Sequence, residues 1–134
     1  MEWRSEYEIG VERIDEQHRE LFSRVARLVE AFRAGRRAEV GATLAFLRTY
    51  VVEHFGTEQA EMAAVRYPGA AAHAAAHARF VKDLVAIESH HAGDPTSPWL
   101  ATNLAIDLAR WLRDHVLGMD QELGRFLRAP ARDP

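Results

Sequence analysis

Two pairs of residues spaced four apart constrain this chain more than any other feature of its sequence. The first pair is His54 and Glu58, and the second is His73 and His77, which follow a turn at Tyr67-Pro68-Gly69. On an α-helix, residues i and i+4 lie on one face, about 6 Å apart. Two neighbouring helices would therefore direct three imidazoles and a carboxylate into one interior. These donors suit a first-row metal such as iron, manganese or zinc.

Apolar residues recur at helical spacing along most of the chain. This period predicts amphipathic helices at about residues 12–34, 37–66, 70–91 and 98–128. Residues 1–11 lack the period, and we expect an extended arm packed on the body. Thr96 or Ser97 is expected to cap the last helix, with Pro98 at its first position. Short connections favour an all-α, up-down-up-down antiparallel four-helix bundle, with residues 1–134 as one domain.

Composition narrows the classes of function. Hydrophobic residues make up 48% and charged residues 28% of the chain, as in soluble globular proteins, and the net charge of −3 favours neither nucleic acid nor an anionic membrane. The absence of cysteine excludes disulfides and thiolate sites, so nitrogen and oxygen must hold any metal. No apolar run reaches the roughly 20 residues of a membrane span, and the N-terminus is too charged for a secretory signal. We therefore expect a cytoplasmic protein.

Six metal-ligating residues occupy core-facing positions of the apolar stripes: His18, His54, Glu58, His73, His77 and His115. A single histidine at such a position is usually an ordinary core residue. Burying five imidazoles and a carboxylate without partners would cost several kcal/mol, comparable with the stability of a domain. A metal that coordinates them removes this cost. Glu88, His90 and His91 lie at a helix end beside the longest loop, and we expect them not to be ligands.

A second carboxylate is needed, and Asp120 is the candidate. His115 and Asp120 are five residues apart, about 140° around an ideal helix, so they should not share a face. Either Asp120 is a solvated surface acid, or the helix gains one residue through a π-bulge or break near Leu117-Gly118. Leu123 resumes a stripe counted from Asp120. The residues alone leave both alternatives open.

These motifs together resemble the hemerythrin family, and within it the single-domain bacteriohemerythrins. The resemblance runs in order from about Trp3 to Leu127. Its motifs are Ile14-Asp15-Glu16-Gln17-His18, His54-Phe55-x-x-Glu58 with Met62, Tyr67-Pro68, His73-x-x-x-His77 and Trp111-x-x-x-His115-x-x-x-x-Asp120. All seven ligand positions of the family are filled, by His18, His54, Glu58, His73, His77, His115 and Asp120. The resemblance implies that Asp120 is a ligand.

The resemblance also implies a non-haem di-iron centre that binds dioxygen reversibly. One iron would take His73, His77 and His115, and the other would take His18 and His54 and keep one position open. Two carboxylates, Glu58 and Asp120, would bridge the irons together with an oxo or hydroxo group. The expected protein is a monomeric oxygen carrier, storage or delivery protein, for which the sequence indicates no protein recipient.

Two further expectations concern the surroundings of the site and its chemistry. Bulky apolar neighbours should exclude water, and the candidates are Phe22, Phe55, Met62, Phe80 and Trp111. The competing functions are a di-iron oxidase, peroxidase or nitric-oxide-handling enzyme, and an oxygen or iron sensor. Oxygen-activating di-iron enzymes are usually rich in carboxylates, whereas this ligand set has five imidazoles and two carboxylates. A sensor would normally carry an output domain, for which 134 residues leave no room. We therefore expect a binding protein rather than an enzyme.

Overall fold

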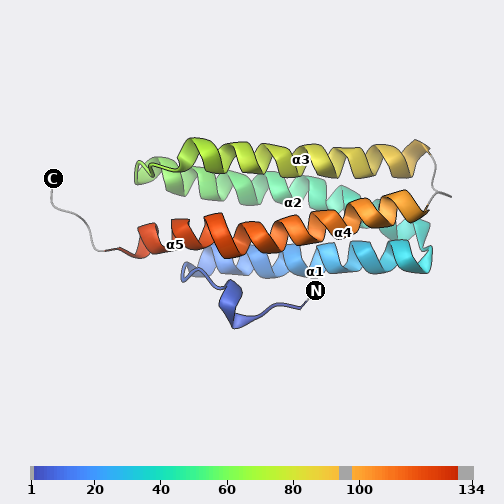
Figure 1. The fold of residues 1–134 in the computed structure, drawn as a ribbon, viewed down its shortest axis with the longest axis horizontal. Helices are drawn as coiled ribbons and strands as arrows, with labels where there is room; N and C mark the ends of the chain where they lie inside the picture. Colours follow the sequence, from blue (N-terminus) through green and yellow to red (C-terminus); the bar gives the residue numbers. More distant parts are fainter. Residues whose placement is uncertain (1, 94–97, 130–134) are drawn as a thin grey trace.

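The computed structural model describes residues 2–93 and 98–129, and these form a bundle of long helices (Figure 1). Helix α1 spans Glu12–Ala34, α2 spans Arg37–Ala64, α3 spans Ala70–Gly93 and α4 spans Pro98–His115. The chain continues from α4 through a π-helical turn, η2 (Val116–Asp120), into α5 (Gln121–Arg128). No strand occurs in the described ranges, which confirms the all-α four-helix bundle.

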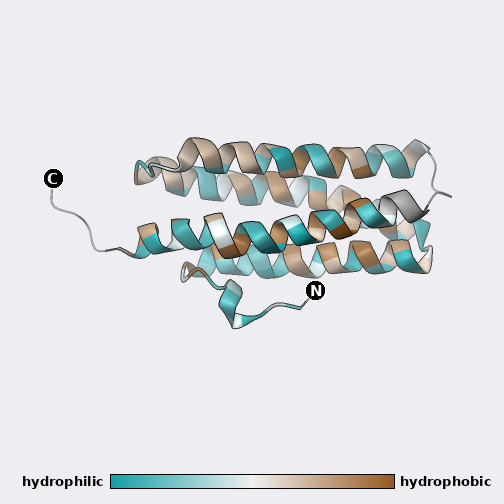
Figure 2. Cartoon of the chain, viewed as in Figure 1, coloured by the Kyte–Doolittle hydropathy of each residue, from teal (hydrophilic) through white to brown (hydrophobic). Residues whose placement is uncertain are grey.

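The helices pack in a closed ring, since α1 contacts α2 and α4, and α3 contacts the same two helices. Hydrophobic and hydrophilic residues alternate along each helix (Figure 2). The buried apolar residues come from all four long helices, for example Leu21, Leu47, Phe80 and Leu108. The bundle interior is therefore apolar except where polar residues enter it.

The observed helix ends differ little from those that the sequence predicts. Helix α1 ends before Gly35, whose φ of 69° lies in the left-handed region that favours glycine. Helix α2 ends two residues before the predicted position, and α3 extends two residues beyond it. The expected N-cap at Thr96 or Ser97 lies outside the described residues.

The N-terminal arm packs on the body, and its Tyr7 and Ile9 are buried. It is not wholly extended, because Ser5–Tyr7 forms one turn of 3-10 helix, η1. Asp15 of α1 fixes the end of the arm, where its carboxylate accepts hydrogen bonds from the Ile9 amide at 2.8 Å and the Gly10 amide at 3.2 Å. The 3-10 turn of the arm, η1, also contacts η2. Among the described residues, no helix is long and apolar enough to span a membrane.

Candidate metal centre

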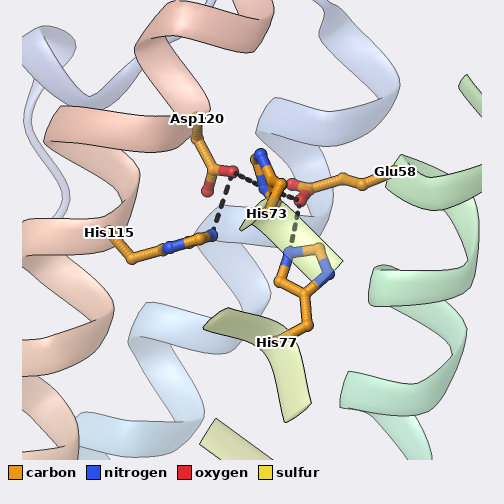
Figure 3. Close-up of side chains that lie close together, drawn as sticks. All are labelled: Glu58, His73, His77, His115 and Asp120. Carbon is orange, nitrogen blue, oxygen red and sulfur yellow. Dashed lines mark hydrogen bonds and ion pairs between the residues drawn. The ribbon is translucent and has the colours of Figure 1, made fainter. Parts of the chain in front are cut away.

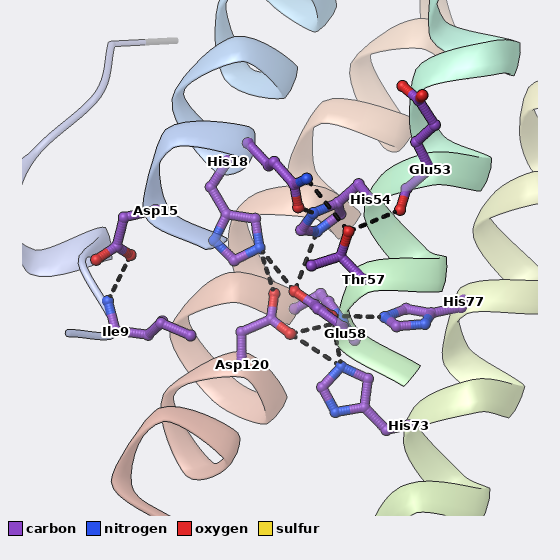
Figure 4. Close-up of polar contacts among 12 residues, drawn as sticks. Ile9, Asp15, His18, Glu53, His54, Thr57, Glu58, His73, His77 and Asp120 are labelled. Carbon is purple, nitrogen blue, oxygen red and sulfur yellow. Dashed lines mark hydrogen bonds and ion pairs between the residues drawn. The ribbon is translucent and has the colours of Figure 1, made fainter. Parts of the chain in front are cut away.

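All seven residues that the sequence singles out as ligands converge inside the bundle (Figures 3 and 4). Each is at most 7% exposed. Every long helix contributes, because the side chains come from α1, α2, α3, the end of α4 and η2. The buried set is His18, His54, Glu58, His73, His77, His115 and Asp120.

The position of Asp120 depends on the π-helical turn. Residues Val116–Asp120 form this turn, which inserts one residue into the helix after His115. Asp120 is fully buried, so the π-bulge alternative is confirmed and the surface alternative is wrong. Gly118 lies in the turn, but a Cβ added there would meet no atom within 4 Å. Glycine is therefore not required at position 118 by close packing.

Glu58 faces imidazoles on both sides of the site. Its Oε2 lies 3.0 Å from Nε2 of His18 and 3.0 Å from Nε2 of His54. Its Oε1 lies 3.1 Å from Nε2 of His73 and 3.0 Å from Nε2 of His77. The two oxygens of one carboxylate thus serve two different groups of histidines.

Asp120 divides its oxygens in the same way. Its Oδ2 lies 3.2 Å from Nε2 of His18, whereas its Oδ1 lies 2.9 Å from Nε2 of His73 and 3.2 Å from Nε2 of His115. We call His18 and His54 the two-histidine side of the site, and His73, His77 and His115 the three-histidine side. Each carboxylate therefore offers one oxygen to each side. This arrangement can bridge two cations.

The donor atoms lie close enough together to share a metal ion. The imidazole–carboxylate distances are 2.9 to 3.2 Å. Imidazole nitrogen and carboxylate oxygen are the donors that suit a first-row metal ion.

Hydrogen bonding alone leaves part of the site unsatisfied. Within the described residues, Nε2 of His77, Nε2 of His115 and both carboxylate oxygens of Asp120 are buried without a hydrogen bond, although each lies close to a site partner. Buried polar atoms in native proteins are nearly always paired. Short contacts between donors that lack hydrogen-bond geometry are expected when the atoms surround a common cation.

Two histidines of the metal-free site have raised pKa values. Burial by itself lowers the pKa of His18, but Asp120 and Glu58 together raise it to about 10. The same balance of burial against these two carboxylates raises the pKa of His73 to about 9. Burial dominates at His77 and lowers its pKa. These raised pKa values favour the protonated rings of His18 and His73, and a metal would have to displace those protons.

The pKa values of the two carboxylates, Glu58 and Asp120, are lowered. Burial favours the protonated acid at Glu58, yet the facing histidines, His18 first among them, hold its pKa well below the usual range. Burial and the charge of Glu58 act the same way on Asp120, and His115, His18 and His73 outweigh them, so its pKa is also lowered. Both groups are therefore ready to coordinate as anions near neutral pH.

Three of the expected apolar neighbours form a connected aromatic wall. Phe55 stacks on His77 with a centroid distance of 3.9 Å, and Trp111 stacks on His115 at 4.6 Å. Phe80 contacts the rings of both Phe55 and Trp111. These rings shield the three-histidine side of the site.

The other two expected neighbours, Phe22 and Met62, do not belong to this group of stacked rings. Phe22 packs against Trp3 and Tyr7 of the arm. Met62 is buried one turn beyond Glu58 on α2. Phe22 therefore joins the arm to the core, and its place as a pocket-lining residue stays a prediction.

The residues expected to be unrelated to the site lie apart from it. Glu88 pairs with Arg48, with 3.7 Å between Oε2 and Nη1, and the ring of His91 lies against Phe32. Neither belongs to the groups of metal-type donors found among the described residues, and nor does His90.

Sequence reasoning missed two residues next to the ligands. Gln17 accepts a hydrogen bond from Nδ1 of His54 at 2.8 Å, and its amide nitrogen donates to Oγ1 of Thr57 at 3.3 Å. Gln17 precedes His18, and Thr57 precedes Glu58. Gln17 stands in the motif Ile14-Asp15-Glu16-Gln17-His18, whereas adjacency to Glu58 is the signal that could have indicated Thr57.

A four-helix bundle whose helices all send buried imidazoles or carboxylates to one point defines a class, the helical-bundle metal proteins. The model of the hemerythrin HHE cation binding domain matches residues 9–127. A bacteriohemerythrin of Stenotrophomonas maltophilia is 33% identical over 95% of this chain and 81% of its own length. A bacteriohemerythrin of Methylococcus capsulatus is 33% identical over 96% of this chain and 98% of its own length. A hemerythrin-like protein of Naegleria gruberi is 28% identical. The chain belongs to the hemerythrin family.

Proposed function

We propose that the protein binds dioxygen reversibly at a non-haem di-iron centre, as an oxygen carrier, storage or delivery protein. The observation that carries the proposal is the division of the carboxylate oxygens. Glu58 and Asp120 each turn one oxygen to the two-histidine side and the other to the three-histidine side. A site for one ion would not need this division.

We assign the donors to two metal positions. The three-histidine position takes His73, His77 and His115, and the two-histidine position takes His18 and His54. With one oxygen from each carboxylate, the first position gains five protein donors and the second gains four. The second position is therefore the one that leaves room for an exogenous ligand.

The charges of the chain suit two divalent cations. Two ferrous ions bring four positive charges, and Glu58, Asp120 and one hydroxide remove three, so only a small positive charge remains in the core. Neutral imidazoles complete the coordination without adding charge. Two irons held there would supply the two electrons that reversible dioxygen binding requires.

The protein's own contribution to reversibility is the exclusion of water and reductants. The seven donors are at most 7% exposed, and the rings of Phe55, Phe80 and Trp111 cover the three-histidine side. Protons that reached the site from outside would turn binding into irreversible oxidation, so a dry apolar wall favours a carrier.

The ligand balance favours binding over catalysis. The site holds five imidazoles and two carboxylates, whereas oxygen-activating di-iron enzymes usually hold more carboxylates. The curated relatives quoted above bear hemerythrin names, which is consistent with a dioxygen-binding protein.

An oxygenation cycle tests the proposal. Protein loaded anaerobically with ferrous iron should develop a visible charge-transfer band in air and lose it when oxygen is removed by argon, over repeated cycles. Replacing both His90 and His91 with Gln is the matched control, because these histidines lie outside the site, and the cycle should be unchanged. A band that never forms, or one that forms once and cannot be reversed, would contradict reversible binding.

A further inference from the structure

A chain of hydrogen bonds runs from the backbone of α2 to the ring of His54 (Figure 4). The Thr57 hydroxyl donates to the carbonyl oxygen of Glu53 at 3.1 Å. The Gln17 amide nitrogen donates to that hydroxyl oxygen at 3.3 Å, and the Gln17 amide oxygen lies 2.8 Å from Nδ1 of His54. Gln17 belongs to α1, so the chain also joins α1 to α2.

The donor and the acceptor of each hydrogen bond in this series follow from the chemistry of the groups involved. A hydroxyl has one proton, and Thr57 uses it on the Glu53 carbonyl, which can only accept. The hydroxyl oxygen must then accept from Gln17, so the amide nitrogen points to Thr57 and the amide oxygen to His54. An amide oxygen cannot donate. Nδ1 of His54 must therefore carry the proton.

A proton on Nδ1 leaves the lone pair of a neutral imidazole on Nε2. Nε2 of His54 lies 3.0 Å from Oε2 of Glu58, which also carries only lone pairs when ionised. With His54 neutral, these two atoms would both be acceptors, and a cation between them, either a proton or a metal ion, would relieve their repulsion. The hydrogen-bond chain thus prepares this side of the site for a metal ion.

The neighbouring imidazoles lack comparable support. Nδ1 of His18, His73 and His77 is buried without a hydrogen-bond partner among the described residues. His54 therefore differs from these three in having a fixed tautomer. It lies on the two-histidine side, where fewer protein donors hold the ion.

We propose that Gln17 and Thr57 are positioning residues that fix the tautomer of His54 and direct its Nε2 lone pair to the metal. This inference rests on the metal centre proposed above. Partners of this kind typically change metal affinity by about 10- to 100-fold. Thr57 acts only by orienting the Gln17 amide, and this indirect role gives a distinctive expectation.

A double-mutant cycle measures that role. Ferrous-iron affinity is determined anaerobically, by competition with a chromogenic chelator, for the wild type, Thr57→Val, Gln17→Glu and the double variant. Thr57→Val should weaken binding of the iron at the two-histidine position about tenfold, which is the lower end of the 10- to 100-fold range. In the Gln17→Glu background the same change should have no effect, because both oxygens of a carboxylate accept and need no orienting partner.

Two controls separate this role from general stability. Thr49→Val removes another hydroxyl that bonds back four residues on α2, at 3.5 Å from the Ala45 oxygen, and it should leave affinity unchanged. Gln17→Leu should weaken binding by about 10- to 100-fold while the metal-free protein keeps its helicity. Equal losses from Thr57→Val in both backgrounds, or no loss in either, would overturn the positioning role. A wild type that binds no ferrous iron would overturn the proposed centre itself.

Discussion

Glu58 is the residue on which both halves of the site depend. It is fully buried on α2, and its two oxygens reach imidazoles from α1, α2 and α3. An acid in this position is stabilised as a carboxylate by hydrogen bonds from the facing histidines, and metal ions would stabilise it as well. Its removal should therefore affect both metal positions.

Glu58→Ala should cause loss of both irons, because each position loses an oxygen donor and the bridge between them. Iron analysis after gel filtration measures the stoichiometry. Glu53→Ala, an exposed acid on the same helix, serves as the control and should keep two irons per chain. Two tightly held irons in Glu58→Ala would rule out the bridging role.

Metal affinity should depend on pH in a direction that follows from two histidines. Near neutral pH the metal-free protein holds protons on His18 and His73, whose pKa values are about 10 and about 9. A metal must displace these protons, since only the neutral ring coordinates. Affinity should therefore rise from neutral pH and level off above the pKa of His18.

Calorimetry in buffers of different ionisation enthalpy measures the proton release. At neutral pH, metal binding should release at least the two protons held by His18 and His73. The His91→Gln variant should release the same number. Affinity that stays constant across the pKa values of both histidines would contradict the protonation states assigned to the metal-free site.

At the scale of elements, the π-helical turn η2 brings the fourth helix into the site. It places Asp120 inside the bundle and lets Leu123 continue the core. The sequence predicted the helix itself from its apolar stripe, but it left the turn open, because helical period alone cannot tell a bulge from a surface acid. Only the family resemblance favoured the buried position.

Deletion of Gly118 should weaken iron binding strongly, because the helix would regain a regular period and the backbone carrying Asp120 would shift. Gly118→Ala is the matched control. Its added Cβ meets no atom within 4 Å, so iron content should be unchanged. Iron analysis and circular dichroism of both variants make the comparison. Full iron binding by the deletion variant would show that the turn is dispensable.

The N-terminal arm supports the same region from outside. Gln121, next to Asp120, donates hydrogen bonds of 3.0 Å to the carbonyl oxygens of Glu6 and Glu8. Gly124 packs so closely on the arm that an added Cβ would lie 2.5 Å from the Ile9 oxygen. The arm and α5 therefore fit together only with a small residue at position 124.

Gly124→Ala should lower the free energy of unfolding by about 1–3 kcal/mol, because the arm or α5 must move to relieve overpacking. Gly56→Ala on α2 is the control. Its Cβ would meet nothing, and the gain in helix propensity should raise stability by up to about 1 kcal/mol. Urea denaturation of both variants gives the two values. Equal stability of the two variants would contradict the close fit of the arm.

At the scale of the whole molecule, the sequence predicted most of the fold because the stripes of α1–α4 repeat without interruption. It also placed six donors on those stripes, since a polar residue in an apolar pattern is visible in sequence. It missed Gln17 and Thr57 because contact between them depends on how α1 and α2 pack. Helical period does not determine that contact.

We propose that two metal ions bind side by side between all the long helices. Anomalous X-ray scattering at the iron edge, from crystals of the loaded protein, measures their positions directly. We expect two iron peaks, one beside His18 and His54 and the other beside His73, His77 and His115, with Glu58 and Asp120 between them. A single peak, or a peak beside Glu88 and His91, would contradict this proposal.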